Sequence, residues 1–197
     1  MKTAGIVLGA LAALVLAAGL WFVGVYNGLV AKREAVNSAW AQVENVYQRR
    51  ADLVPNLVAT VKGAASFEKS TLQAVVEARS RVGSVTVDKS VLDNPAQFKK
   101  FEQAQAGLGS ALSRLMLVVE RYPQLRATEN FRDLQVQLEG TENRIAVERR
   151  SFNDVAQDYN TAIQRMPASL VAGFGGFRSR PYFQAQAGAE TVPVVKF

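Results

Sequence analysis

The chain has 197 residues, and 23 Lys and Arg against 17 Asp and Glu give it a formal net charge of +6. It contains neither cysteine nor histidine. These absences exclude disulfide frameworks, zinc fingers, thiolate nucleophiles and histidine bases. Any catalysis would have to use carboxylates, lysines, tyrosines or hydroxyls.

The N-terminal segment is nearly uncharged, since Lys2 is the only charged side chain before residue 32. Residues 5–25 consist only of Ala, Gly, Ile, Val, Leu, Trp and Phe. About 20 apolar residues in a helix span the core of a bilayer. We therefore predict a transmembrane signal-anchor over residues 1–31, in preference to a buried core helix or a cleaved signal peptide.

The following 40 residues or so show helical spacing. Residues 27–66 carry apolar or large side chains that alternate by three and four positions, which is the pattern of a helix packed in a bundle. Pro55 lies inside this segment and is expected to kink or loosen it. The first of the two rows is Leu29, Val36, Val43 and Leu57, and the second is Tyr26, Trp40, Tyr47, Val54 and Val61.

Three more helices are predicted. A short one covers about residues 68–82, and residues 83–94 form the one real loop. Asn94 and Pro95 are a good helix start, so the third helix should begin there and end at Tyr122. The fourth, over about 128–166, has apolar residues at seven-residue intervals, with Thr128 as its N-cap. The predicted fold is all-α, with the transmembrane helix followed by an elongated antiparallel four-helix bundle over residues 32–167.

Arginines in apolar rows indicate a structural polar core. Arg50 falls in the core row between Val43 and Leu57, and a buried guanidinium must be paired. Antiparallel alignment of the first and fourth helices predicts Glu142 as its partner, unless Arg50 extends outward to solvent. Arg79 is expected to be a second polar insertion with a similar partner.

Two Tyr-Asn pairs stand near the ends of these helices. Tyr26-Asn27 opens the first helix and Tyr159-Asn160 lies near the end of the fourth. The same antiparallel alignment predicts that the pairs are neighbours at the membrane-proximal end, where tyrosine suits an interface with one wet edge.

The tail, residues 168–197, combines aromatic and basic residues. If the fourth helix returns to the bilayer, this tail begins beside the headgroups, and we expect it to dock on a membrane or a partner. Alternatively, its aromatic residues fold back onto the base of the bundle. Residues beyond 184 are expected to be partly disordered. The expected docking residues are Phe174, Phe177, Arg178, Arg180 and Phe183.

Several motifs resemble those of the LemA family of bacterial membrane-anchored helical proteins. They are Tyr26-Asn27-Gly28-Leu29-Val30, residues 49–58 (RRADLVPNLV), Glu77-Ala78-Arg79, Tyr122-Pro123-Gln124-Leu125, residues 141–145 (TENRI) and Tyr159-Asn160. The resemblance covers Val25 to about Phe177. It implies a single-pass protein of the bacterial inner membrane. It implies no catalytic residue, because the family's molecular function is not established.

The flanking charges weakly indicate the orientation. The N-terminal flank offers the amino group and Lys2, whereas the other flank offers Lys32 and Arg33. The excess of positive charge favours a cytoplasmic bundle by about one charge.

The favoured function is a non-enzymatic scaffold or tether that acts through protein–protein contacts at the membrane. Its partners are expected to be membrane lipid, through the N-terminal helix, and further copies of the chain, with other membrane proteins possible; no nucleic acid and no cofactor are expected. One alternative is a metal-binding or enzymatic bundle based on carboxylates such as Glu44, Asp52, Glu142 and Glu148. Another is a protein that binds an anionic surface of lipid or nucleic acid, suggested by the net charge of +6.

Overall fold

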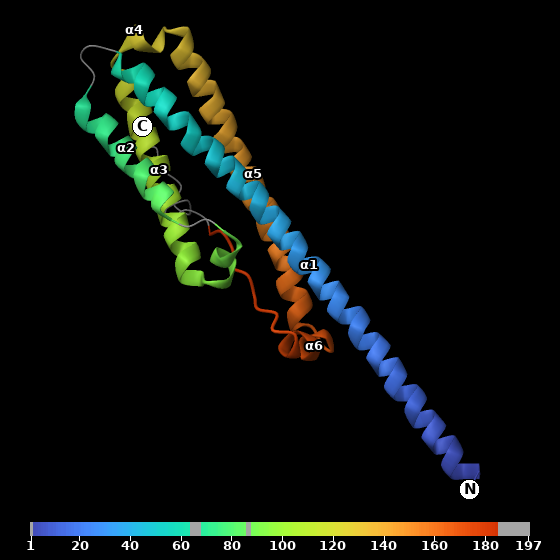
Figure 1. Cartoon of the computed structure of the whole chain (residues 1–197). Coiled ribbons are helices and arrows are strands. Elements are labelled where there is room, and N and C mark those ends of the chain that lie inside the picture. The colour runs from blue at the N-terminus through green and yellow to red at the C-terminus, as the bar shows by residue number, and fades with distance from the viewer. Residues whose placement is uncertain (1, 64–67, 86–87, 185–197) are drawn as a thin grey trace, which may run out of the picture.

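The computed structural model describes residues 2–63, 68–85 and 88–184 (Figure 1). Within these ranges the ordered elements are helices and no strand occurs, so the predicted all-α class is confirmed. The elements are α1 (Lys2–Lys62), α2 (Lys69–Ser84), the 3₁₀ helix η1 (Lys89–Asp93), α3 (Pro95–Val119), α4 (Pro123–Arg126), α5 (Glu129–Gln164) and α6 (Ala168–Phe174).

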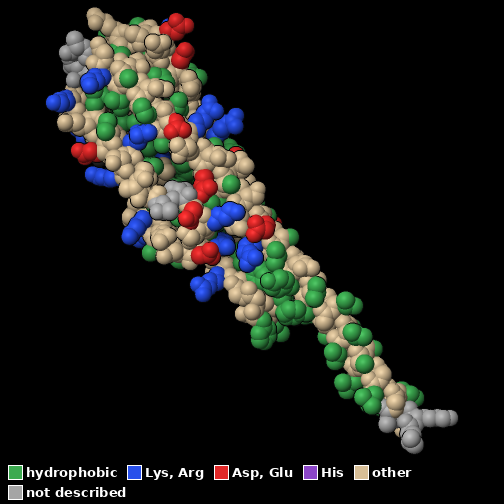
Figure 2. All heavy atoms as spheres, in the orientation of Figure 1, with side chains coloured by type: hydrophobic (Ala, Val, Ile, Leu, Met, Phe, Trp, Pro, Cys, Tyr) green, Lys and Arg blue, Asp and Glu red, His purple; other side chains and the backbone are tan. Residues whose placement is uncertain are grey.

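Helix α1 is one continuous element of 61 residues, which corresponds to a length of about 90 Å at 1.5 Å per residue. Its first part is long and apolar enough to cross a membrane, and the side chains described there are exposed. We call residues 5–25 the stalk. Figure 2 shows hydrophobic side chains along the stalk and again at the base of the helical domain, where charged side chains begin. The anchor therefore leads into the domain without a break in the helix.

The domain is built around the second half of α1. Helix α5 runs back along α1 in the opposite direction, and α2 and α3 pack against each other on another side of α1 (Figure 1). Helix α4 joins α3 to α5 at the tip farthest from the stalk, and α6 lies beside α1 at the base. Apart from the partly buried Tyr26, the expected apolar rows are buried, and Val36, Val43, Trp40 and Val61 each have 0% of their surface exposed.

Local sequence signals explain some of the helix ends. The Asn94 side chain accepts hydrogen bonds from the main-chain N–H groups of Ala96 and Gln97, at 3.1 and 3.2 Å, so it caps α3 as predicted. Thr128 is the N-cap residue of α5, but its hydroxyl donates to the main-chain oxygen of Leu125 at 2.7 Å. Pro55 does not end α1, which is helical on both sides of it.

The predicted loop 83–94 is partly helical. Residues 89–93 form η1, because Asp88 caps it by accepting a hydrogen bond from the Ser90 N–H at 2.7 Å. Val91 and Leu92 are buried, with 0% and 1% of their surface exposed. This segment therefore belongs to the core, where it packs beside the start of α3.

Candidate functional site

Arg50 of α1 lies inside the helical domain with 4% of its surface exposed. Its Nη1 donates to both carboxylate oxygens of Glu142 on α5, at 3.0 and 3.3 Å. Its Nη2 donates to the main-chain oxygen of Gln105 on α3 at 3.0 Å and to the side-chain Oε1 of the same residue at 2.5 Å. The structure thus brings the expected pair together and adds Gln105, so one guanidinium joins three helices.

The surroundings of Arg50 are uneven in polarity. Gln105 is 5% exposed, whereas the Glu142 side chain is 44% exposed. The Tyr47 ring lies on another side, with its centroid 5.0 Å from the Arg50 Cζ. Because Glu142 still reaches water, the pair avoids much of the desolvation cost of a fully enclosed ion pair.

Arg79 does not enter the core, and the prediction that it is a buried residue with an acidic partner is wrong. It is exposed, and its Nε donates to the main-chain oxygen of Ala51 in α1 at 3.0 Å. Ala51 lies four residues before Pro55, which has no N–H to complete the usual helical hydrogen bond. Arg79 therefore supplies the hydrogen bond that Pro55 removes from α1.

The tail folds back along α5. We call residues 175–184 the C-terminal strap. Asn160 donates to the Arg180 main-chain oxygen at 2.9 Å and accepts from the Arg180 N–H at 2.8 Å. Asn153 makes the same two bonds with Phe183, both at 2.9 Å. Two asparagines seven residues apart thus hold the strap by its main chain.

Two glycines allow the chain to turn from the end of α6 into the strap. Gly176 has φ +68°, a left-handed conformation that glycine adopts without strain. A Cβ added at Gly175 would lie 2.5 Å from the Phe177 ring and 3.1 Å from the Tyr26 ring. The glycines that follow Phe174 are therefore required by the turn and by the close approach of α1.

The five expected docking residues fall into two groups, one buried and one exposed. Phe177, Arg180 and Phe183 are buried, so they do not form the exposed docking surface that the sequence predicts. The Phe183 ring stacks 6.1 Å from Trp40, and Arg180 forms an ion pair with Asp93. The alternative, that the aromatics pack on the helical domain, holds for both of these phenylalanines. Phe174 and Arg178 remain exposed, while the predicted disorder beyond residue 184 lies outside the described residues.

The two Tyr-Asn pairs contact the strap. The Tyr26 ring meets Phe177 edge to face at 5.4 Å, and Asn27 is exposed. Tyr159 is fully buried, and Asn160 holds Arg180 as described. Within the described part of the chain, no hydrogen bond or ring contact joins one pair to the other. Their direct proximity therefore remains a prediction.

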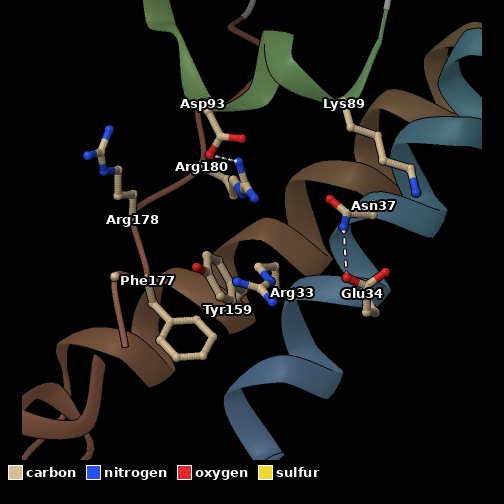
Figure 3. Close-up of a pocket in the computed structure, with 10 residues that line it drawn as sticks. Arg33, Glu34, Asn37, Lys89, Asp93, Tyr159, Phe177, Arg178 and Arg180 are labelled. Atoms are coloured by element: carbon tan, nitrogen blue, oxygen red, sulfur yellow. Dashed lines mark hydrogen bonds and ion pairs between the residues drawn. The ribbon is translucent and has the colours of Figure 1, made fainter. Parts of the chain in front are cut away.

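A cavity of about 300 Å³, here called the base pocket, lies between α1, η1, α5 and the strap (Figure 3). Arg33 enters it from α1, Lys89 from η1 and Arg180 from the strap. Burial raises the pKa of the Tyr159 hydroxyl, while the Arg180 and Arg33 cations act in the opposite direction. The Tyr159 hydroxyl and the Arg180 Nε are buried, and their protons have no hydrogen-bond acceptor in the protein, although the Arg178 main-chain N–H lies close enough to the Tyr159 oxygen to act against the increase in its pKa.

A second opening, of about 1260 Å³, runs between α3 and α5. We call it the α3/α5 groove. Tyr47 and Arg50 of α1 line it, and its walls mix polar residues with apolar ones such as Leu117 and Leu138. Leu117 is 72% exposed there, so the groove offers apolar contact area to solvent.

Three of the four carboxylates considered for metal chemistry, Glu44, Asp52 and Glu142, have hydrogen-bond partners of their own. Glu44 accepts a hydrogen bond from the Trp40 Nε1 at 2.6 Å, Asp52 accepts one from Gln48 at 2.9 Å, and Glu142 binds Arg50. Among the residues described, no group of three or more Asp or Glu side chains is placed to hold a metal ion.

Over the residues that the structure describes, these features define an all-helical protein with one apolar helix able to span a membrane and a domain that this helix enters directly. Residues 39–197 match the model of the LemA family, which is more than half of the chain, so the protein belongs to the LemA family. The match extends to the end of the sequence, farther than the motifs quoted above.

Curated relatives include magnetosome proteins. The chain is 28% identical over 186 residues to magnetosome protein MamQ 2 of Paramagnetospirillum magneticum, covering 86% of this chain and 68% of the relative. It is 29% identical over 187 residues, with the same coverage, to magnetosome protein MamQ of Magnetospirillum gryphiswaldense. It is 23% identical over 151 residues to protein LemA of Metamycoplasma hominis, covering 77% and 65%. None of these names denotes an enzyme.

Two residues that organise the site were missed from the sequence. Gln105 interrupts the apolar row of α3 between Phe101 and Leu108, and a lone polar residue in such a row is a detectable signal. Asn153 precedes Asn160 by one heptad, so both lie on one stripe of α5. A search for polar residues inside apolar rows would have found Gln105, and the repeat of asparagine at one heptad is the signal for Asn153.

Proposed function

We propose that this protein is a non-enzymatic scaffold or tether, held in the bacterial inner membrane by the stalk, with the helical domain on the cytoplasmic side. The continuity of α1 carries the proposal, because one helix of 61 residues forms both the apolar stalk and the centre of the domain. A helix without a flexible joint fixes the height and direction of the domain relative to the bilayer. Such a geometry suits a protein that positions partners.

The α3/α5 groove supports the proposal as a surface for protein contacts. Its mixed lining and the exposed Leu117 resemble the composition of non-obligate interfaces, in which apolar and polar contacts alternate. Family membership and relatives whose names denote no enzyme are consistent with this role.

Photo-crosslinking in native membranes tests the proposal. A photoreactive phenylalanine derivative at Ser113 or Leu117, both in the groove, should capture defined proteins that mass spectrometry can identify. The same group at the exposed Gln73 on α2 is the matched control. Equal capture at all three positions, or none in the groove, would refute the groove as the contact surface.

The orientation has its own test. The chain lacks cysteine, so Gln124→Cys, on the exposed surface of α4, creates a single labelling site. We expect a membrane-impermeant maleimide to label it only after the cells are opened. Labelling in intact spheroplasts would place the domain on the outer side.

Self-association is also part of the proposal. Apolar side chains remain exposed on the outside of α5, with Val136 at 67% and Val147 at 63%. Homo-oligomers are common, and these positions provide apolar area for contact between copies. Light scattering of the full-length protein in mild detergent should give a mass above that of the monomer, and a constant monomer at every concentration would exclude this.

A further inference from the structure

The base pocket has an excess of positive charge. Four cationic and two anionic side chains line it, which leaves a net charge of +2. They come from three separate parts of the chain, so the fold itself gathers them. The cations are Arg33, Lys89, Arg178 and Arg180, and the anions are Glu34 and Asp93.

The two anions of the pocket already have partners. Glu34 accepts a hydrogen bond from Asn37 at 3.1 Å, and Asp93 is held by Arg180. In contrast, the hydroxyl proton of Tyr159 and the Nε proton of Arg180 have no acceptor in the protein, although both groups are buried and the Arg178 main-chain N–H lies near the Tyr159 oxygen. Buried polar groups are nearly always satisfied, so these two atoms indicate a missing acceptor. An oxyanion beside Arg33 would provide it (Figure 3).

The position of the pocket indicates where this anion comes from. The Phe177 ring forms part of the pocket wall. Its centroid lies 5.4 Å from that of the Tyr26 ring and 5.1 Å from the Cζ of Arg33. Tyr26 follows directly on the last residue of the stalk. The pocket therefore begins within about two helical turns, roughly 11 Å, of the apolar segment.

Helix α6 adds an apolar surface beside the pocket. Its residues Leu170 and Phe174 are 56% and 86% exposed, and the preceding Met166 is 72% exposed. Figures 1 and 2 show α6 and hydrophobic side chains gathered at the base, where the stalk leaves the domain. An amphiphile with its acyl chains beside the stalk and α6 would place its headgroup at the pocket.

We propose that the base pocket binds the phosphate of one anionic phospholipid, held by Arg33, Lys89, the free Nε of Arg180 and the Tyr159 hydroxyl. This inference rests on the membrane attachment in the proposed function but needs no protein partner. Bound lipid would tie η1, α5 and the strap to the membrane surface, in addition to the stalk.

Native mass spectrometry of the full-length protein in neutral detergent tests the proposal. The protein is titrated separately with phosphatidylglycerol, with phosphatidylcholine of the same acyl chains, and with inorganic phosphate. We expect phosphatidylglycerol to be retained most strongly and Arg33→Met to weaken its retention about tenfold, the loss of one charge-assisted contact. Tyr159→Phe should also weaken retention, since it removes the hydroxyl proton that the phosphate would accept.

Lys32→Met is the matched control, because it removes one positive charge at the same height but outside the pocket. It should leave retention unchanged. Equal retention of the two lipids, or equal loss in Lys32→Met and Arg33→Met, would overturn the pocket in favour of general surface charge. Saturation by inorganic phosphate at the same concentration would overturn the assignment to a lipid. Missing groove crosslinks would refute the groove as the contact surface of the scaffold and leave this inference standing.

Discussion

Arg50 shows how one side chain can set the register of three helices. Its guanidinium donates four hydrogen bonds, two to α5 and two to α3, from a position on α1. Sliding α5 along α1 by one residue would separate Arg50 from Glu142 and leave a buried charge unpaired. The interaction therefore specifies one alignment of the helices more than it adds stability.

Truncation of Glu142 tests this coupling. Glu142→Ala should lower the free energy of unfolding by about 2 kcal/mol, less than the 3–5 kcal/mol typical of enclosed pairs, because water can reach the vacated side. In an Arg50→Met background, Glu142→Ala should change the free energy of unfolding only a little. Denaturant titration of the full-length protein in detergent measures both, with Glu139→Ala as an exposed control on α5. Additive losses would show that the two residues are not coupled.

Arg79 and Pro55 form a second coupled pair. Arg79→Met keeps the aliphatic part of the side chain but removes the hydrogen bond to Ala51, so it should lower the free energy of unfolding by about 1 kcal/mol. In a Pro55→Ala background α1 supplies its own N–H to Ala51, and the cost of Arg79→Met should fall toward zero. A double-mutant cycle by thermal unfolding gives the comparison. An unchanged cost in the Pro55→Ala protein would contradict this explanation.

Glu44 should make the stability of the folded protein depend on pH. Partial burial raises the pKa of its carboxyl above 4.5, and the nearby Asp88 adds to the increase, although the Trp40 hydrogen bond opposes it. The folded state thus favours the protonated form of Glu44. The contribution of Glu44 to the free energy of unfolding is therefore fully present below pH 4.5 and is lost as the pH rises through the raised pKa.

Glu44→Gln should remove that dependence, because the amide oxygen can still accept from Trp40 but carries no charge. We expect the variant to gain stability relative to the native protein as pH increases from about 4 to 7. Melting temperatures across this range provide the measurement, and Glu34→Gln on the exposed side of α1 is the control. Parallel curves for native protein and Glu44→Gln would contradict the assignment.

At the level of single residues, sequence reasoning succeeded where the partner was a side chain in a helical row. The antiparallel alignment found Glu142 opposite Arg50, because heptad spacing fixes the axial position of both. It failed for Arg79, whose acceptor is a main-chain oxygen left free by Pro55. A search that pairs charges cannot find such an acceptor, although Pro55 itself marks Ala51 as the carbonyl without a partner.

At the level of elements, the strap was the main difference from expectation. Aromatic and basic residues beside a membrane suggested docking, yet Asn153 and Asn160 recognise the main chain of the strap and turn Phe177 and Phe183 inward. Composition does not reveal main-chain recognition. Similarly, η1 was predicted as a loop because its five residues are too few for helical periodicity to be seen.

Asn160→Asp should release the strap. The aspartate loses the donor to the Arg180 oxygen and carries a charge into a buried position, so the closed state should weaken by about 2 kcal/mol. Limited trypsin digestion should then cut the exposed Arg178–Ser179 bond about 30 times faster. Asn143→Asp, at an exposed position of α5, is the control. Equal cleavage rates in the two variants would show that Asn160 does not hold the strap.

At the level of the whole molecule, the helical class and the expected apolar rows followed from periodicity, since a long helix repeats its signal many times. From Lys32 to Lys62 the helix rises about 46 Å. The tip formed by α4 should therefore stand far above the bilayer.

Fluorescence energy transfer can measure that height. A donor on Gln124→Cys and acceptors on lipid headgroups should be more than about 40 Å apart in reconstituted vesicles, a separation that follows from the rise of α1. A donor on Asn27→Cys at the base should be strongly quenched. Comparable quenching at both sites would mean that the domain lies down on the membrane.

The pairing of α1 with α5 has a consequence for the order of biosynthesis. The ribosome completes α1 at Lys62, but α5 ends only at Gln164, about 100 residues later. At about 5–20 residues per second, the apolar rows of α1 wait roughly 5–20 seconds for their main partner. During that interval the stalk can already be inserted, and the unpaired half of α1 is exposed to chaperones and proteases. The strap follows α5 in the sequence, so the base of the domain is completed after α1 and α5 have paired.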